Sequence, residues 1–141
     1  MNTVFNYLPL SPDIPRHYEL GDVNEFPVKP NVFIAEGLAV SVDSEAYAKP
    51  LQTGEGEHFV GFAEQAVDMS TGGHGERTVR VKSAGKIHLE VPEVNHSHLH
   101  ATVYASSENS FTLAAEGNIA IGKIYRVNED GSCIVSFQAP A

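Results

Sequence analysis

Three histidines at every second position are the residues of this chain with the clearest potential for chemistry. His96, His98 and His100 lie in the stretch VPEVNHSHLHATVY, residues 91–104. Alternate side chains of a β-strand leave the same face, so a strand here would bring the three imidazoles close together. Imidazole is the commonest metal ligand in proteins, and this spacing therefore suggests part of a metal site.

The same stretch also contains residues that favour a loop. Pro92 and Asn95 are typical of turns, which leaves only His98 and His100 for the start of a strand. We therefore expect a surface loop with solvated histidines, no catalytic metal and no cofactor. Near a symmetry axis, such a loop would trap a metal between subunits without doing chemistry. A metal-dependent enzyme built on the three histidines stays open as the minor alternative.

Other catalytic patterns are incomplete in this sequence. The Gly-rich stretch STGGHGERT, residues 70–78, lacks the strand-to-helix context and the Gly-Lys pairing of a phosphate loop. There is no G-x-S-x-G elbow, and Cys133 alternates with Val135 and Phe137 as a buried hydrophobe would. Neighbouring carboxylates such as Glu55 and Glu57 fall in turn-like segments and are expected to be solvated. The sequence therefore predicts a protein that is not an enzyme.

Composition limits the class of protein and its partners. A chain of 141 residues with 42% hydrophobic content suits one globular domain. Its net charge is −9, and its densest basic stretch, RVKSAGK at residues 80–86, holds only three cations. Because phosphate contacts supply most nucleic-acid affinity, no nucleic-acid partner is expected. No apolar run is long enough to cross a membrane, no signal peptide is evident, and the single cysteine suits synthesis in a reducing cytoplasm.

The first thirty residues differ from the rest of the chain. They hold five of the eight prolines, which discourage helices and central strands. They also carry seven large apolar side chains: Val4, Phe5, Tyr7, Leu8, Leu10, Ile14 and Tyr18. We therefore predict an extended proline-rich arm over residues 1–30, which packs on a neighbouring molecule or, as the less favoured alternative, on its own domain. Residues 31–141 are predicted to form a single β domain.

Short alternating apolar runs separated by turn signals follow from Asn31 onward, and no segment has convincing helical periodicity. The pattern predicts an all-β fold, either a small sandwich or a barrel. Residues 83–85 are predicted to turn a hairpin between RTVRVK and KIHLEV. Simple alternation places Phe59 opposite Val60 and Phe62, and it places Tyr125 on the same face as Ile121.

The order of these runs resembles the phage capsid cement, or decoration, proteins over residues 32–138. The similarity is carried by a series of short motifs: Phe59-Val60-Gly61-Phe62-Ala63, Val79 to Val91 around Gly85, Val103-Tyr104-Ala105-Ser106 before Phe111, Ile121-Gly122-Lys123-Ile124, and Ile134 to Phe137. One departure is the His-rich loop, which stands where such chains often have an Asp-Gly-Asp turn.

This resemblance implies a small structural protein on the outer surface of a phage head. Such proteins are often trimers that clasp neighbouring subunits of the major capsid protein and stabilise the shell. The arm is then expected to contact a neighbour, and the chain to be made in the host cytoplasm. A β-sandwich module that binds glycan or a host surface stays as an alternative, with Tyr47 and Tyr104 as its aromatic contacts.

Overall fold

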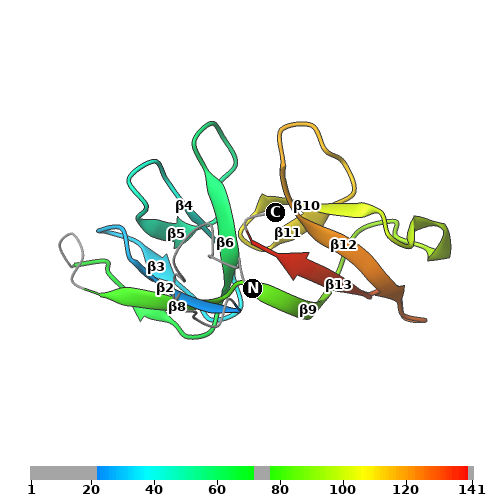
Figure 1. The fold of residues 1–141 in the computed structure, drawn as a ribbon, viewed down its shortest axis with the longest axis horizontal. Helices are drawn as coiled ribbons and strands as arrows, with labels where there is room; N and C mark the ends of the chain where they lie inside the picture. The colour runs from blue at the N-terminus through cyan, green and yellow to red at the C-terminus, as the bar shows by residue number, and fades with distance from the viewer. Residues whose placement is uncertain (1–21, 72–76, 140–141) are drawn as a thin grey trace, which may run out of the picture.

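The structure, a computed structural model, describes residues 22–71 and 77–139, and in this part of the chain all regular elements except one 3-10 turn are strands. The all-β prediction is therefore confirmed. The N-terminal lobe contains β2 (Val23–Pro27), β3 (Phe33–Ile34), β4 (Ala39–Val42), β5 (Ala48–Pro50), β6 (His58–Ala63), β7 (Val67–Asp68) and β8 (Thr78–Lys82). The C-terminal lobe contains β9 (Ala84–Leu89), the 3-10 turn η1 (His96–His98), β10 (Thr102–Ser107), β11 (Ser110–Thr112), β12 (Ile119–Val127) and β13 (Cys133–Gln138). The two lobes lie side by side along the long axis of the molecule (Figure 1).

The sheet of the N-terminal lobe curls toward a closed barrel. Its strand order is β2-β8-β6-β4-β5. The two outer strands meet through a parallel bridge between Val28 and Ala48, and the Lys29 N–H donates to the Ala48 carbonyl at 2.9 Å. The pair β3-β7 adds Ile34 and Val67 to the core that this curled sheet encloses. We call this the N-terminal core; its buried members are Val28, Ile34, Val40, Val42, Ala48, Ala63, Val67, Met69, Val79 and Val81.

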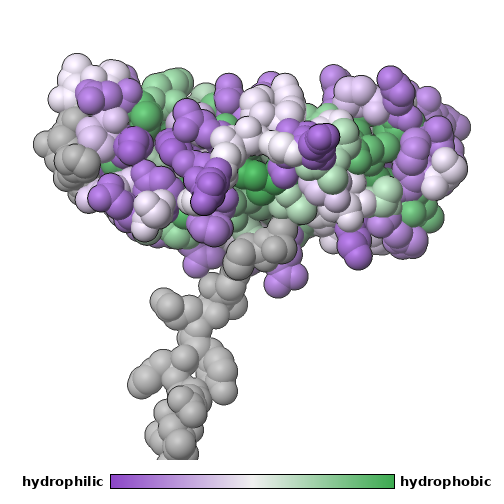
Figure 2. Space-filling model, turned by 90° about the horizontal axis from the view of Figure 1, so that it is seen from above, coloured by the Kyte–Doolittle hydropathy of each residue, from purple (hydrophilic) through white to green (hydrophobic). Residues whose placement is uncertain are grey.

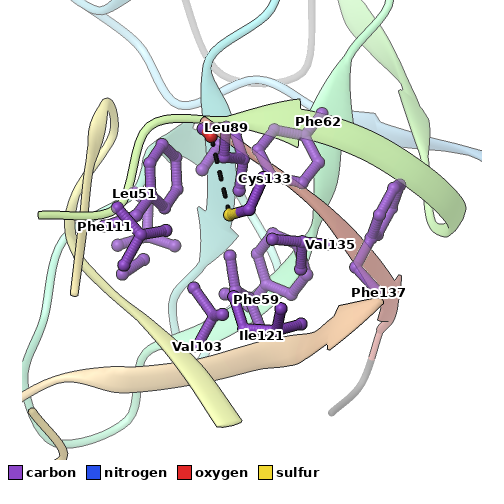
Figure 3. Packing of buried hydrophobic residues seen from close by; sticks show 14 residues of the cluster. Leu51, Phe59, Phe62, Leu89, Val103, Phe111, Ile121, Cys133, Val135 and Phe137 are labelled. Carbon is purple, nitrogen blue, oxygen red and sulfur yellow. Dashed lines mark hydrogen bonds between the residues drawn. The ribbon is translucent and has the colours of Figure 1, made fainter. Parts of the chain in front are cut away.

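The sheet of the C-terminal lobe is open and packs one face against the N-terminal lobe. Its order is β11-β10-β12-β13-β9, with antiparallel neighbours. The core between the lobes, called the shared core, combines Phe59 and Phe62 from β6 with side chains of all five C-terminal strands. Phe62 lies 5.0 Å from Phe137 and 6.1 Å from Phe111 between ring centroids, so aromatic contacts join the lobes (Figure 3). The fold therefore combines the two predicted architectures, a curled barrel-like sheet with a second sheet packed on its outside.

Ser83 is the junction between the lobes, and the hairpin predicted at residues 83–85 is wrong. The strands on either side of Ser83, β8 and β9, belong to different sheets and do not pair with each other. The Ser83 hydroxyl donates to the Val60 carbonyl at 2.8 Å, and the Asn24 amide donates to that hydroxyl at 2.9 Å. These hydrogen bonds hold the buried Ser83 against β6 and β2 at the point where the chain crosses between the sheets.

Bulges overturn the two predictions of side-chain direction. Val60 is an extra residue in β6 opposite β4, so Phe59 and Phe62 face the same shared core, with ring centroids 5.5 Å apart. Tyr125 is likewise an extra residue in β12 opposite β13. Ile124 is therefore buried, whereas Tyr125 is 47% exposed. Simple alternation fails at both positions because an added residue reverses the direction of every side chain that follows it.

The last part of the predicted arm, residues 22–30, packs on the chain's own domain. Residues 23–27 form β2, which pairs with β8 over its whole length, and Val28 is fully buried. Residues 22–30 therefore belong to the folded domain although Pro27 and Pro30 lie among them. Pro27 is tolerated because it ends an outer strand, where a missing amide costs little. The seven apolar arm residues, from Val4 to Tyr18, lie outside the described residues.

Candidate interaction surface

The His-rich loop is a 3-10 turn, and the strand hypothesis for it is wrong. His96 and His98 lie within η1, and His100 has a left-handed backbone with φ of 70° before β10 begins at Thr102. Asn95 caps the turn: its side-chain oxygen accepts from the Ser97 N–H at 2.9 Å. In return, the Asn95 N–H donates to Nδ1 of His98 at 3.0 Å.

This conformation removes the reason for expecting a metal site from alternate spacing. His96 and His100 are exposed and His98 is partly buried, as the loop interpretation expects. Within residues 22–71 and 77–139, no group of three or more His, Cys, Asp or Glu side chains is arranged to hold a metal ion. The Nδ1 atom of His98 already accepts a backbone hydrogen bond, so its ring orientation serves the cap.

Glu57 does not behave as the solvated charge that its sequence context predicts. Its carboxylate accepts from Lys49 Nζ at 2.6 Å and from the Ser41 hydroxyl at 3.0 Å. The side chains of Lys49 and Glu57 are only 10% and 12% exposed, and Ser41 is fully buried. The Gln52 N–H donates to Ser41 Oγ at 3.2 Å, which ties the β5–β6 loop to this cluster. Sequence reasoning missed the cluster because Ser41, Lys49 and Glu57 meet only when β4, β5 and the loop pack together.

Two other features singled out in the sequence are Cys133 and the Gly-rich stretch. Cys133 is fully buried in the shared core, where its thiol lies 3.6 Å from the Leu89 carbonyl, so the buried-hydrophobe prediction is confirmed (Figure 3). Burial raises the pKa of this thiol, which makes it a poor nucleophile. Residues 72–76, which form most of the Gly-rich stretch, lie outside the described residues.

The outer face of the C-terminal sheet carries a row of exposed polar side chains. Lys123 of β12, Ser136 of β13 and Lys86 of β9 are directly opposite one another and form one row across the sheet. Their three side chains are exposed, whereas the adjacent row, which includes Ile124 and Val135, is buried in the shared core. Because side chains alternate between faces, the lysine row points away from the N-terminal lobe. We call this surface the open face.

Charge and aromatic groups gather on the open face. Lys86 Nζ lies 4.0 Å from the centroid of the Tyr125 ring, a cation–π contact. Arg126 is exposed and pairs in register with Ile134, which in turn pairs with His88. Lys86, Lys123 and Arg126 form no ion pair with any carboxylate in the described part of the chain.

Two grooves border the open face. The first, of about 460 Å³, is lined by residues of β10, β12 and β13, including Thr102, Gly122 and Ser136, with Lys123 among its walls. The second, of about 840 Å³, lies at the turns that end β9, β10 and β12, and its lining includes Glu90, Glu93 and Asp130. The sheet therefore has a basic face and, at the turns, a groove with three carboxylates.

The two tyrosines proposed for glycan binding lie on different lobes. Tyr47 precedes β5 in the N-terminal lobe, and Tyr104 lies on β10 of the C-terminal sheet, opposite Ala120. Tyr125 was not among the predicted contact residues because simple alternation placed it in the core. The cations of the open face were also missed, since they are spread over strands that only the sheet brings together.

The comparisons with known proteins provide no relative. No family model, no curated protein and no solved structure matches this chain. Across the described residues, no helix is long and apolar enough to cross a membrane.

Proposed function

We propose that this chain is a phage capsid cement protein, which binds the outer surface of the major capsid protein lattice and stabilises the head without catalysis. The observation that carries the proposal is where the quoted motifs fall in the fold. They coincide with β6, with β8 and β9, with β10, with β12 and with β13, which are six of the twelve strands of the described chain and occur in both lobes. The motif order is thus the order of the structural elements.

The glycines of two motifs occupy positions where no other residue fits. A Cβ atom on Gly61 would lie 2.3 Å from the Lys82 carbonyl oxygen, and one on Gly122 would lie 2.3 Å from that of Ser136. Both distances are far below van der Waals contact, so each glycine is required for close approach of neighbouring strands. The resemblance therefore depends on residues with a definite role in this fold, which supports its use.

The physical task of a cement protein agrees with these features. A capsid shell resists the pressure of packed DNA better when a bound protein buries surface across the seams between subunits. A proline-rich arm loses little entropy when it becomes ordered along a neighbour, because its backbone is already restricted. In this proposal the arm residues from Val4 to Tyr18 contact a neighbouring subunit, and the chain associates with itself, as a trimer, on the shell.

The first test is whether the chain sediments with intact virions on a density gradient, and in what ratio to the major coat protein. Copy numbers close to those of the coat protein support a lattice-wide cement. A few copies per particle would point to a vertex or spike protein. Absence from particles would overturn the proposal and return the histidine loop to first consideration.

The second test concerns the arm. Deletion of residues 1–20 keeps Asp22, whose carbonyl accepts from the Ser83 N–H at 2.7 Å, and should leave the domain folded. We expect that the truncated chain no longer binds to phage heads that were prepared without this protein. A full-length chain with Tyr7, Leu8 and Leu10 replaced by Ala serves as the matched variant, since it keeps the arm length. Undiminished loading by the truncated chain would remove the arm from the proposal.

A further inference from the structure

We propose that the open face binds a second copy of this chain, through contacts between Lys86, Lys123 and Arg126 of one copy and Glu90, Glu93 and Asp130 of the other. The inference rests on the self-association included in the proposed function and names the surfaces that carry it. It begins from an uneven distribution of charge between the strands and the loops of the C-terminal lobe.

The five strands of the C-terminal sheet contain no Asp or Glu. They do contain Lys86, Lys123 and Arg126, all exposed, and His88. The net charge of the whole chain is −9, and these strands carry +3 with His neutral, so the rest of the chain carries −12. The basic face of one copy therefore has the opposite charge to the rest of another copy, so the two attract each other.

In the N-terminal lobe, by contrast, four of the five described cations are already paired. Lys29, Lys49 and Lys82 lie 3.0, 2.6 and 3.4 Å from carboxylate oxygens. Arg80 lies 3.8 Å from Glu25. The open face therefore gathers three of the four described cations that form no ion pair, and the fourth is Arg77.

The complementary surface lies at the turns of the same lobe. Glu90, Glu93 and Asp130 are exposed and line the groove of about 840 Å³. The hydroxyl and the N–H of Ser132 both donate to Asp130, at 2.7 and 3.0 Å, and these hydrogen bonds lower the pKa of that carboxyl. Asp130 is accordingly ionised at neutral pH, and the groove presents negative charge to a cationic partner.

A second copy fits the open face better than a nucleic acid does. Three cations neutralise few phosphates, and the other −12 of the chain repels a polyanion. A second copy, in contrast, supplies three carboxylates that line one groove, equal in number to the three cations. Because the basic face and the acidic groove are different surfaces of one lobe, each copy offers both, and such contacts close into rings when the rotation between copies allows.

The remaining features of the open face suit a protein contact. Tyr104 and Tyr125 lie on it, and aromatic side chains combine apolar area with a polar group, as is typical of interfaces. The groove of about 460 Å³ next to Lys123 is large enough to receive side chains of the partner. Electrostatic pairs at the rim of such an interface set orientation and salt dependence.

The test is charge reversal with complementation, measured by sedimentation velocity on the full chain at low and high salt. Lys86→Glu with Lys123→Glu reverses the open face, and Glu90→Lys with Glu93→Lys reverses the groove. We expect the wild-type chain to associate at low salt and each double variant to associate at least about tenfold more weakly. An equimolar mixture of the two variants should regain association, because each then supplies the charge that the other lacks.

A control variant separates the surface from the net charge. Glu36→Lys with Glu64→Lys changes the net charge as much as the groove variant does, but in exposed turns of the N-terminal lobe. This control should associate like the wild type, and circular dichroism should show that all variants are folded. A monomeric wild type at its highest soluble concentration, equal loss in the control, or a mixture of folded variants that stays monomeric would each overturn the inference.

Loading onto heads is measured separately, so the two proposals fail in different ways. If the charge-reversal variants bind to heads and also associate with themselves as the wild type does, only the proposed interface is overturned and the cement function is not. If the wild-type chain is absent from virions but the mixture of variants regains self-association, the cement function is overturned and the proposed interface is supported.

Discussion

The two lobes use their charges in opposite ways. In the N-terminal lobe, Lys49 and Glu57 form an ion pair that is almost buried, and the Ser41 hydroxyl completes it. In the C-terminal lobe, Lys86 and Lys123 stand exposed in one row of an open sheet, with no carboxylate within ion-pair distance in the described chain. Lys49 is thus part of the packing of its lobe, whereas Lys86 and Lys123 are available to a partner.

The hydrophobic cores of the two lobes also differ in whether one lobe alone forms them. The N-terminal core is enclosed by its own lobe, but the shared core combines C-terminal strands with Phe59 and Phe62 of β6. The C-terminal sheet therefore has one face covered by the N-terminal lobe and the other left open. A sheet with one solvated face is ordinary for antiparallel strands, so its basic charge rather than its exposure distinguishes it.

The largest expected effect comes from removing the aromatic link between the lobes. Phe62→Ala deletes contacts with Phe59, Phe111 and Phe137 and should lower the free energy of unfolding by about 3–5 kcal/mol. Urea unfolding measures this change, and hydrogen exchange should show the greater loss of protection in the C-terminal strands. Ile34→Val, within the N-terminal core, is the control, with an expected cost of about 0.5–1.5 kcal/mol. Equal loss of protection in both lobes would contradict the dependence of one on the other.

The second effect tests the two kinds of cation directly. Lys49→Met leaves the carboxylate of Glu57 without its cation in a nearly buried site and should cost about 3 kcal/mol in unfolding free energy. Lys123→Met removes an exposed charge without a partner and should change stability by less than about 0.5 kcal/mol. Similar costs for both substitutions, measured by urea unfolding, would abolish the contrast between the lobes.

The third effect concerns the junction. Ser83→Ala removes the donor to the Val60 carbonyl and the acceptor for the Asn24 amide, and it should cost about 1 kcal/mol because a buried hydroxyl with two part-buried hydrogen bonds is lost. Ser136→Ala, on the solvated open face, is the matched control and should be close to neutral. Thermal unfolding of the two variants gives the comparison, and a neutral Ser83→Ala would show that backbone contacts alone hold the crossing.

The smallest effect is a dependence of stability on acid. The hydrogen bond from Lys29, with further donors from the N–H groups of Glu45 and Tyr47, lowers the pKa of Asp43 below its ordinary value of 3.8. Because the folded pKa is the lower one, this contribution is fully present above the unfolded pKa. It is lost as pH falls from about 5 through the folded pKa.

Asp43→Asn should therefore reduce the loss of stability in this acid range, as measured by urea unfolding at a series of pH values. Asp130→Asn provides the comparison in the C-terminal lobe, where hydrogen bonds from Ser132 are the main cause of the lowered pKa and the charge of His88 contributes least. High salt should weaken the Asp43 effect more than the Asp130 effect, because the largest cause at Asp43 is a charged partner, Lys29, whereas at Asp130 it is the neutral Ser132. Equal salt sensitivity would contradict these causes.

Several features were predictable from local pattern alone. Alternation placed Val79 and Val81 in the core, and it placed Cys133 and Val135 together on the last strand, because uninterrupted strands alternate with a fixed period. Pro92 and Asn95 favoured a solvated loop for the His-rich stretch. In the structure His96 and His100 are exposed and His98 is partly buried.

Other features required residues distant in sequence. The bulges at Val60 and Tyr125 arise where neighbouring strands fall out of register, and they alone put Phe59 in the shared core and Tyr125 outside it. The separation of β8 from β9 brings Ser83 into hydrogen bonds with two other strands, at Asn24 and Val60. The ion pair of Lys49 with Glu57 depends on the loop between β5 and β6.

The sequence by itself thus determined the all-β class and the periodic core positions, since hydrophobic alternation is a property of each strand alone. The tertiary structure decided which strands share a sheet, where the chain crosses between lobes, and which charges are paired. Lys86 and Lys123 are 37 positions apart in the chain, and only their common partner, Ser136 of β13, makes them one surface. Pairing across strands is a relation between distant segments, and no local pattern carries it.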